Sequence, residues 1–437
     1  MRIILATPLD YTTFDNIEHH MVRYYVERGD EVTVISKVMN RSTSPLAMIW
    51  QTVSCTSRRV RGDGFDVFYV DPMFNYYAGL RRAAETRAEG GGTEPGAPGG
   101  RAKLLLIRLL TPLSILRDVL FLPCFLVVAL ARCPRADVCI GMGPWGSLLA
   151  FALAKLGRVK LWMYKDRDYE PGLVPDKLRQ DYTHRLEQAL VRRADLLVTI
   201  GHRLGRLRQA QSGRRALFVP TGVDWQRFAT VRTQPRLGNT LVYVGKLVPW
   251  SGLDVVIKAL PAILAAVPGA RLRVIGDDLA TVRDKLQRLA DAHGVGDRVT
   301  FCGAVPHPQI AASLAEDADI GLANSEPIPY RQYAFPLKVI EYMAAGIPVI
   351  ATDDTESAEI LERADCGVSC AYDPASFAAV ATALLQDGER RRRYGANGVR
   401  GSEEMAWSTV LDRERALMVD ALAERRRGAP ARRAEAA

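Results

Sequence analysis

Residues 333–353 read YAFPLKVIEYMAAGIPVIATD and place a short helix directly before a buried strand. Pro336 suits the first turn of a helix and Gly346 suits its end, so the stretch predicts a helix over 336–345. Glu341 is the only acid in this otherwise apolar helix, and the run VIAT that follows is typical of a strand buried in a parallel sheet. A single carboxylate in this setting calls for a partner, either a ligand or a neighbouring side chain.

The predicted helix also suggests a ligand. Its N-terminus offers backbone N–H groups and a partial positive charge, which favour a phosphate group. Lys338 lies in the first turn, and Glu341 follows on the same side at i,i+3 spacing. This arrangement fits a nucleoside diphosphate whose diphosphate lies at the helix tip and whose ribose lies over Glu341. The alternative is that Lys338 and Glu341 pair with each other on an exposed face, and spacing alone leaves both open.

Strand and helix patterns alternate on both sides of this stretch. Apolar runs such as RIILAT and EVTVIS in the first half, and TLVYV and RLRVI in the second, are each followed by a helical pattern. Alternation of this kind indicates parallel, doubly wound sheets. Two such halves of about 200 residues predict an α/β protein with two Rossmann-like domains that face a central cleft, with ligands at the carboxyl ends of the strands.

Composition excludes several classes of protein. The 437 residues carry a net charge of +9, but no basic run is interleaved with aromatic residues, so a nucleic-acid partner is not expected. The N-terminal apolar run is too short for a signal peptide. Seven Cys residues without a CxxC pair indicate free thiols in a reducing compartment, which predicts a cytoplasmic protein.

The most lipid-like segment is 104–131. Arg108, Arg117 and Asp118 interrupt it, and its longest uncharged stretch, 119–131, is shorter than the roughly 18 residues that a spanning helix needs. The segment is therefore expected to be either a buried helix or an element that lies on the inner membrane surface.

Several stretches together resemble one family. PLKVIEYMAAGIPVIATD is similar to the signature of the family 4 glycosyltransferases, which have the GT-B fold. Further resemblances occur in the family's order, at NIEHHMVRYYVERGDEVTVIS (16–36), VPTGVDWQRF (219–228), LVYVGKLVPWSGLDVVIKAL (241–260) and EEMAWSTVLDRERALM (403–418). The resemblance implies a retaining enzyme that moves a sugar from a nucleoside diphosphate sugar (UDP or GDP), with no cofactor and no metal.

The resemblance also implies roles for residues. Glu341 is expected to bind the ribose, Lys246 to contact the diphosphate, and Gly245 to bind the nucleotide sugar. Lys338, singled out by its place in a chain that is poor in lysine, completes the expected catalytic set of Lys246, Lys338 and Glu341. Phosphate is expected at the main chain of Phe335, Pro336 and Leu337, and the base near Gly276 and Val305.

The sequence departs from the family pattern in three places. Tyr333 stands where the family has a Glu that touches the donor sugar, and Ser251 stands where its phosphate loop has a Lys. We expect Lys338 to supply the missing charge from the helix side. Asp15 and Asn16 replace a Gly-Gly pair, where Asn16 tolerates the turn and Asp15 either contacts an acceptor or sugar or caps the helix.

The stretch YKDRDYEPG (164–172) follows a predicted strand. Lys165, Asp166 and Asp168 are candidate contacts to the acceptor or to the donor sugar. The D-R-D sequence also fits the metal motif of the other glycosyltransferase fold, but so short a motif is not specific and no metal site is predicted. His307 is interpreted as a loop residue.

The expected organisation is an N-terminal acceptor-binding domain (1–228, with a flexible loop at 85–103), a linker (229–238), a C-terminal nucleotide-sugar-binding domain (239–402), a helix returning to the first domain (403–425) and a disordered tail (426–437). The acceptor is either a small natural product or a lipid-linked glycan, the latter with peripheral membrane contact through 104–131. The alternatives are a GT-B nucleotide-sugar epimerase and a catalytically impaired nucleotide-binding module.

Overall fold

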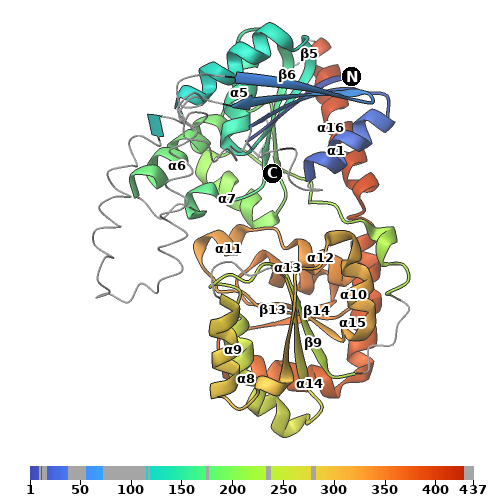
Figure 1. Ribbon diagram of the computed structural model, residues 1–437. Coiled ribbons are helices and arrows are strands. Elements are labelled where there is room, and N and C mark those ends of the chain that lie inside the picture. Colours follow the sequence, from blue (N-terminus) through green and yellow to red (C-terminus); the bar gives the residue numbers. More distant parts are fainter. Residues whose placement is uncertain are drawn as a thin grey trace. The chain divides into compact units, whose positions relative to one another are not determined.

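The computed structural model describes residues 1–8, 11, 17–37, 56–71, 115–116, 119–173, 177–232, 238–276 and 282–427 (Figure 1). It divides into two compact units, Met1–Val219 with Leu411–Ala437, and Pro220–Val410. Asp15, Asn16, the loop 85–103 and the tail from 428 onward lie outside the described residues. The domain boundaries expected from the sequence stay predictions.

The first unit is built on an eight-stranded sheet in the order β3-β4-β2-β1-β5-β6-β7-β8. All neighbouring strands are parallel except β3 and β4. The strands are β1 (Arg2–Thr7), β2 (Glu31–Lys37), β3 (Thr56–Gly62), β4 (Phe65–Asp71), β5 (Ala136–Met142), β6 (Val159–Asp166), β7 (Leu196–Thr199) and β8 (Leu217–Phe218). The helices are α1 (Ile17–Glu27), α5 (Gly143–Lys155), η1 (Glu170–Leu173), α6 (Lys177–Val191) and α7 (His202–Ser212).

Strand β3 was not predicted from the sequence. Its residues, TSRRVRG, have no apolar face, and the strand forms the antiparallel edge of the sheet through a tight turn to β4. Arg58, Arg59 and Arg61 are exposed, and Arg59 pairs with Asp66 at 2.6 Å. Charged side chains on an edge strand oppose pairing with another chain, which explains why this strand lacks the usual apolar pattern.

The second unit is built on a six-stranded parallel sheet in the order β11-β10-β9-β12-β13-β14. Its strands are β9 (Thr240–Val244), β10 (Arg271–Ile275), β11 (Val299–Gly303), β12 (Ile320–Ala323), β13 (Val349–Thr352) and β14 (Gly367–Cys370). Its helices are η2 (Trp225–Phe228), α8 (Leu253–Ala266), α9 (Val282–Ala292), η3 (Gly296–Arg298), η4 (His307–Gln309), α10 (Ile310–Asp317), α11 (Pro329–Tyr333), α12 (Leu337–Ala344), α13 (Glu356–Ala364), α14 (Pro374–Gln386) and α15 (Gly388–Glu403).

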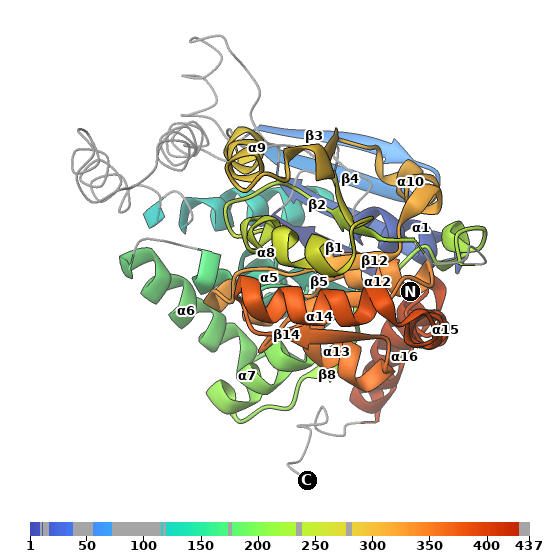
Figure 2. The ribbon, with the colours of Figure 1, turned by 90° about the horizontal axis from the view of Figure 1, so that it is seen from below.

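Helices cover both faces of this second sheet. Figure 2 shows α14 beside α8, and these two helices pack with the sheet around one apolar cluster. Helices α10 and α12 pack with the sheet around the other apolar cluster. The prediction of two doubly wound parallel sheets is confirmed.

The last helix, α16 (Trp407–Arg426), joins the first unit from Leu411 onward. Inside that unit, the hydroxyl of Tyr25 donates to Glu414 at 2.6 Å, and the ammonium of Lys165 pairs with the same carboxylate. Lys165 and Glu414 are both almost fully buried. Strand β6 and helix α1 are therefore both fixed to α16 by one buried carboxylate.

The helical residues 119–132 have one buried and one exposed apolar side. Phe121, Cys124 and Val128 are buried in the first unit, whereas Val119 and Val127 are 49% and 64% exposed. In the described ranges, no helix combines the length and the hydropathy of a membrane-spanning segment. The helix therefore contributes to the core of the first unit, and membrane contact through this segment stays a prediction.

Candidate functional site

Helix α12 begins and ends where its sequence predicts. Pro336 caps its N-terminus, and Gly346, with φ +68°, closes its C-terminus in the left-handed region that favours glycine. The hydroxyl of Tyr342 accepts from the backbone N–H of Val244 at 2.8 Å and fixes the helix against β9. The orientation of Lys338 and Glu341 on this helix is therefore set by buried packing.

Lys338 lies beside the loop that follows β9. Its Nζ atom is 3.8 Å from the centre of the Tyr243 ring, within the range of a cation–π interaction. The same atom is only 3.0 Å from the position that a Cβ atom on Gly245 would occupy. The absence of a side chain at Gly245 thus lets the ammonium approach the backbone of this loop. The structure thus brings Lys338 and Gly245 together, and both were predicted to bind the nucleotide sugar.

A second cation stands close to Lys338. Burial and the neighbouring positive charge of Arg331 lower the pKa of Lys338 to about 7, although Glu341 acts in the opposite direction. Among the described residues, the buried Nε atom of Arg331 has no hydrogen-bond partner. Two cations held this close favour a bound anion, because an anion would relieve their mutual repulsion. The sequence analysis missed Arg331, since arginine is common in this chain and no motif marked it.

Glu341 is 6% exposed, and its Oε1 atom lies 2.7 Å from Nε2 of His307. The other ring nitrogen of His307, Nδ1, lies 3.2 Å from a guanidinium nitrogen of Arg227. A guanidinium can only donate, so Nδ1 accepts, and the proton on Nε2 is donated to Glu341. Within the described part of the chain, the carboxylate of Glu341 thus pairs with His307 and not with Lys338.

The sequence analysis also missed this role of His307. The residue begins η4, which follows β11, and lies 34 positions before Glu341 in the chain. The only local signal was its place in VPHPQI, directly after the predicted strand VTFCGAV.

The other predicted residues of the second unit occupy α11, the start of α12 and the loops after β9, β10 and β11. Lys246 is exposed, and its carbonyl accepts from the hydroxyl of Tyr243 at 3.0 Å. Gly276 packs so closely that a Cβ atom there would lie 1.8 Å from the carbonyl oxygen of Gly245. Ser251 is buried, Leu337 is exposed, and Val305, Tyr333, Phe335 and Pro336 are half-buried. Their contacts with a ligand stay predictions.

In the first unit, Lys165 and Asp166 are paired inside the fold. Lys165 pairs with Glu414, as described above, and the carboxylate of Asp166 accepts from Nε of Arg208 at 2.6 Å. Both residues are at most 2% exposed, which gives them a packing role. Asp168 is half-buried, and its carbonyl accepts from the N–H of Glu170 at 3.0 Å. Contacts of these three residues with an acceptor or a sugar stay predictions.

No group of three His, Cys, Asp or Glu side chains is arranged as a metal-ligand set in the described ranges. Asp166, the first acid of the D-R-D sequence, already pairs with Arg208.

The chain was compared with known proteins. Residues 231–400 match the family described as Glycosyl transferases group 1. Among curated proteins, a phosphatidyl-myo-inositol mannosyltransferase of Mycobacterium leprae is 29% identical over 45% of this chain and 52% of its own length. A GDP-mannose-dependent alpha-(1-6)-phosphatidylinositol monomannoside mannosyltransferase of Mycobacterium tuberculosis is 33% identical over 44% of this chain and 53% of its own length. The matched part thus spans about half the length of these relatives.

Solved structures match over a longer part of the chain. Sucrose-phosphate synthase from Thermosynechococcus elongatus superposes with a TM-score of 0.66, covering 97% of this chain and 99% of that one at 18% identity. At this identity the likeness concerns the fold alone. It shows that the chain has the GT-B fold, and residues 231–400 are similar to the group 1 glycosyltransferases.

Proposed function

We propose that this protein is a retaining glycosyltransferase that moves a sugar from a UDP- or GDP-linked donor to a lipid-linked or small natural-product acceptor. The observation that carries the proposal is the position of Lys338 beside the Gly245 loop, one helical turn from Glu341 and close to the charge of Arg331. The name of the mycobacterial relative, a GDP-mannose-dependent enzyme, favours GDP-mannose as the first donor to test.

In the proposed reaction, the diphosphate lies against the N-terminus of α12 and the two cations. Their charges stabilise the negative charge that develops as the bond between the sugar and the diphosphate breaks. The acceptor hydroxyl forms the new bond on the same face of the sugar, and the departing phosphate takes its proton. Glu341 accepts hydrogen bonds from the ribose hydroxyls and so fixes the register of the donor.

Tyr333 and Ser251 stand where the family pattern has a Glu and a Lys, and this loss of two charged residues motivated the alternative of an impaired nucleotide-binding module. Lys338 supplies positive charge beside the loop that follows β9, close to the charge of Arg331, and this charge would replace the lysine whose place Ser251 takes. This compensation favours the enzyme. The epimerase alternative has no comparable observation in its support.

Thermal unfolding in the presence of UDP, GDP, dTDP and ADP tests the proposal. A nucleotide at a hundred times its dissociation constant should add about 2.7 kcal/mol to the free energy of unfolding. The donors of the best nucleotide are then tested for turnover, including slow hydrolysis. Binding without turnover of any donor would support the binding module instead, and no binding at all would refute the proposal.

The lowered pKa of Lys338 predicts that nucleotide binding depends on pH. Without nucleotide this amine is half-protonated near pH 7, and a bound diphosphate favours the ammonium, so binding takes up a proton above pH 7. The affinity of the wild type for UDP or GDP should therefore fall as the pH rises from 7 to 9, by at most about tenfold per pH unit. Isothermal titration calorimetry in buffers of different ionisation enthalpy measures this proton uptake.

Two variants of this residue isolate the effect. Lys338→Arg stays charged across this range and should flatten the pH dependence, while Lys338→Met should weaken binding about tenfold and also flatten it. Because all three proteins bind the same nucleotide, ionisation of the phosphates cancels in the comparison. An unchanged affinity in Lys338→Met would show that Lys338 does not contact the diphosphate.

The hydrogen bond from His307 to Glu341 predicts an effect on recognition of the ribose. His307→Ala should reduce the preference for GDP over 2′-deoxy-GDP about fivefold, because the carboxylate loses the partner that orients it. His307→Gln should keep most of this preference, since its amide N–H can replace Nε2–H. His293→Ala, which changes a histidine elsewhere in the same unit, is the matched control. Equal ribose preference in all four proteins would contradict the assigned role.

A further inference from the structure

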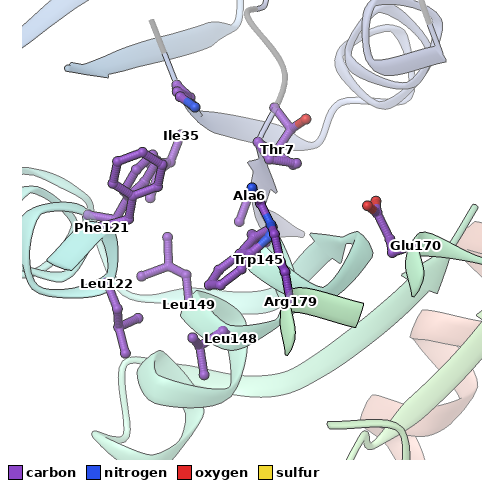
Figure 3. Close-up of a pocket in the computed structure, with 14 residues that line it drawn as sticks. Ala6, Thr7, Ile35, Phe121, Leu122, Trp145, Leu148, Leu149, Glu170 and Arg179 are labelled. Atoms are coloured by element: carbon purple, nitrogen blue, oxygen red, sulfur yellow. The ribbon is translucent and has the colours of Figure 1, made fainter. Parts of the chain in front are cut away.

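The first unit contains an apolar pocket of about 260 Å³ at the carboxyl ends of β1 and β2 (Figure 3). Strand β1 lies between β2 and β5. The chain adds β2 on one side of β1, and β5 and the strands after it are added on the other side. The pocket is thus at a topological switch point, where open α/β sheets bind ligands.

One wall of the pocket is apolar. It is formed by Ile35 of β2, by Phe121, Leu122 and Phe125 of the helical residues 119–132, and by Leu148 and Leu149 of α5. In Figure 3, Ile35, Phe121 and Leu122 lie on one side of the pocket and Glu170 lies on the other. This wall would bury an alkyl chain or a ring.

Three ionisable side chains line the pocket. Lys37 and Arg179 both line it, and the Lys37 ammonium is 4.7 Å from the centre of the Phe121 ring. Burial, together with the nearby charge of Asp168, raises the pKa of Glu170 to about 7. Near neutral pH, the lining of the pocket thus contains two cations and one carboxyl group that is only partly ionised.

We propose that this pocket binds an anionic amphiphile, with its chain against the apolar wall and its anionic group at Lys37 and Arg179. A neutral apolar ligand would desolvate both cations and supply no anion in return, which is unfavourable. A small inorganic anion would leave the apolar wall in water. A ligand that is both apolar and anionic satisfies both parts of the pocket.

The apolar surface continues outside the pocket. Leu122 lines the pocket, while Val119, three residues earlier on the same helix, is 49% exposed. A chain longer than the pocket could continue along this exposed surface. The ligand could therefore be a soluble amphiphile or a lipid in a membrane, which share the same chemistry.

The identification of this amphiphile as the sugar acceptor rests on the proposed function. The binding of the amphiphile to the pocket does not depend on that function. The experiment is calorimetric titration of the full chain with octyl phosphate below its micelle concentration. Octanol, inorganic phosphate and octyltrimethylammonium serve as comparison ligands. We expect one octyl phosphate per chain, and affinity should rise about fourfold for each methylene added from butyl to octyl phosphate.

Two variants at the pocket have matched controls on α6. Arg179→Gln should weaken octyl phosphate binding about tenfold, whereas Arg185→Gln, an exposed residue on the same helix, should leave it unchanged. Leu122→Gln should weaken binding and reduce the dependence on chain length, whereas Leu178→Gln, which changes a leucine that is 56% exposed, should not.

Equal binding of octanol and octyl phosphate, or no loss in Arg179→Gln, would overturn the proposal. Sedimentation with phosphatidylcholine vesicles, with and without phosphatidylglycerol, distinguishes a membrane lipid from a soluble amphiphile. Binding to the anionic vesicles that Arg179→Gln weakens identifies a lipid, and binding of octyl phosphate alone identifies a soluble amphiphile. Nucleotide titrations of the same samples test the second unit, so binding of one ligand without the other shows which proposal fails.

Discussion

Glu341→Ala is expected to weaken binding of the preferred nucleoside diphosphate at least about 100-fold. The ribose hydroxyls would donate two hydrogen bonds to this carboxylate, and bonds to a charged group contribute about 1.5–3 kcal/mol each. Their loss corresponds to about 3 kcal/mol or more, and each 1.4 kcal/mol changes the dissociation constant about tenfold. Glu341 is 6% exposed, so the interaction is poorly screened by water. Calorimetric titration of wild type and variant measures the change directly.

The controls separate recognition of the ribose from damage to the fold. Glu362→Ala removes an exposed carboxylate from α13 in the same unit and should bind like the wild type. Glu341→Gln keeps the shape of the side chain but only one acceptor oxygen, so its affinity for the nucleotide should lie between those of the wild type and Glu341→Ala. A 2′,3′-dideoxynucleotide should bind wild type and Glu341→Ala equally. If Glu341→Ala instead binds the ribonucleotide as tightly as the wild type does, Glu341 does not contact the ribose.

The sequence predicted those parts of the structure that depend on local pattern. Helix α12 lies within one residue of its predicted bounds at each end, because Pro336 and Gly346 act through their own backbone. Apolar runs such as β1 and β9 predicted buried parallel strands for the same reason. Strand β3 escaped prediction because an edge strand that exposes arginine has no such pattern.

The side-chain partners could not be predicted in the same way. His307 meets Glu341 across 34 residues of chain, and Glu414 meets Lys165 across 249. Such pairs form because the fold packs together segments that are far apart in the chain, and no local spacing encodes which side chains then touch. Lys165 and Asp166, charged residues at the end of a strand, were predicted as ligand contacts. The structure shows both in buried ion pairs that the sequence did not predict, and their contacts with a ligand stay predictions.

The second large effect is expected in the first unit, where Arg208→Ala should destabilise the fold by about 3–5 kcal/mol. Arg208 is fully buried, and its guanidinium pairs with Asp166 at 2.6 Å and with Glu187 at 2.9 Å. Removing it leaves two buried carboxylates without a counter-charge. A change of this size should lower the unfolding temperature by roughly 10 °C, which differential scanning calorimetry resolves.

The pH dependence of the stability lost in Arg208→Ala identifies the cause of the loss. Burial raises the pKa of Glu187 even with Arg208 present, and removing the guanidinium can only raise it further. A carboxyl group whose pKa is higher in the folded state loses stability as the pH rises above its unfolded pKa. The loss of unfolding free energy in Arg208→Ala should therefore be small near pH 5 and larger at pH 8. The loss should nearly vanish in a triple variant that combines Asp166→Leu, Glu187→Leu and Arg208→Met. A deficit that is equal at both pH values, and that persists in the apolar triple variant, would show that lost packing and not the stranded charge is responsible.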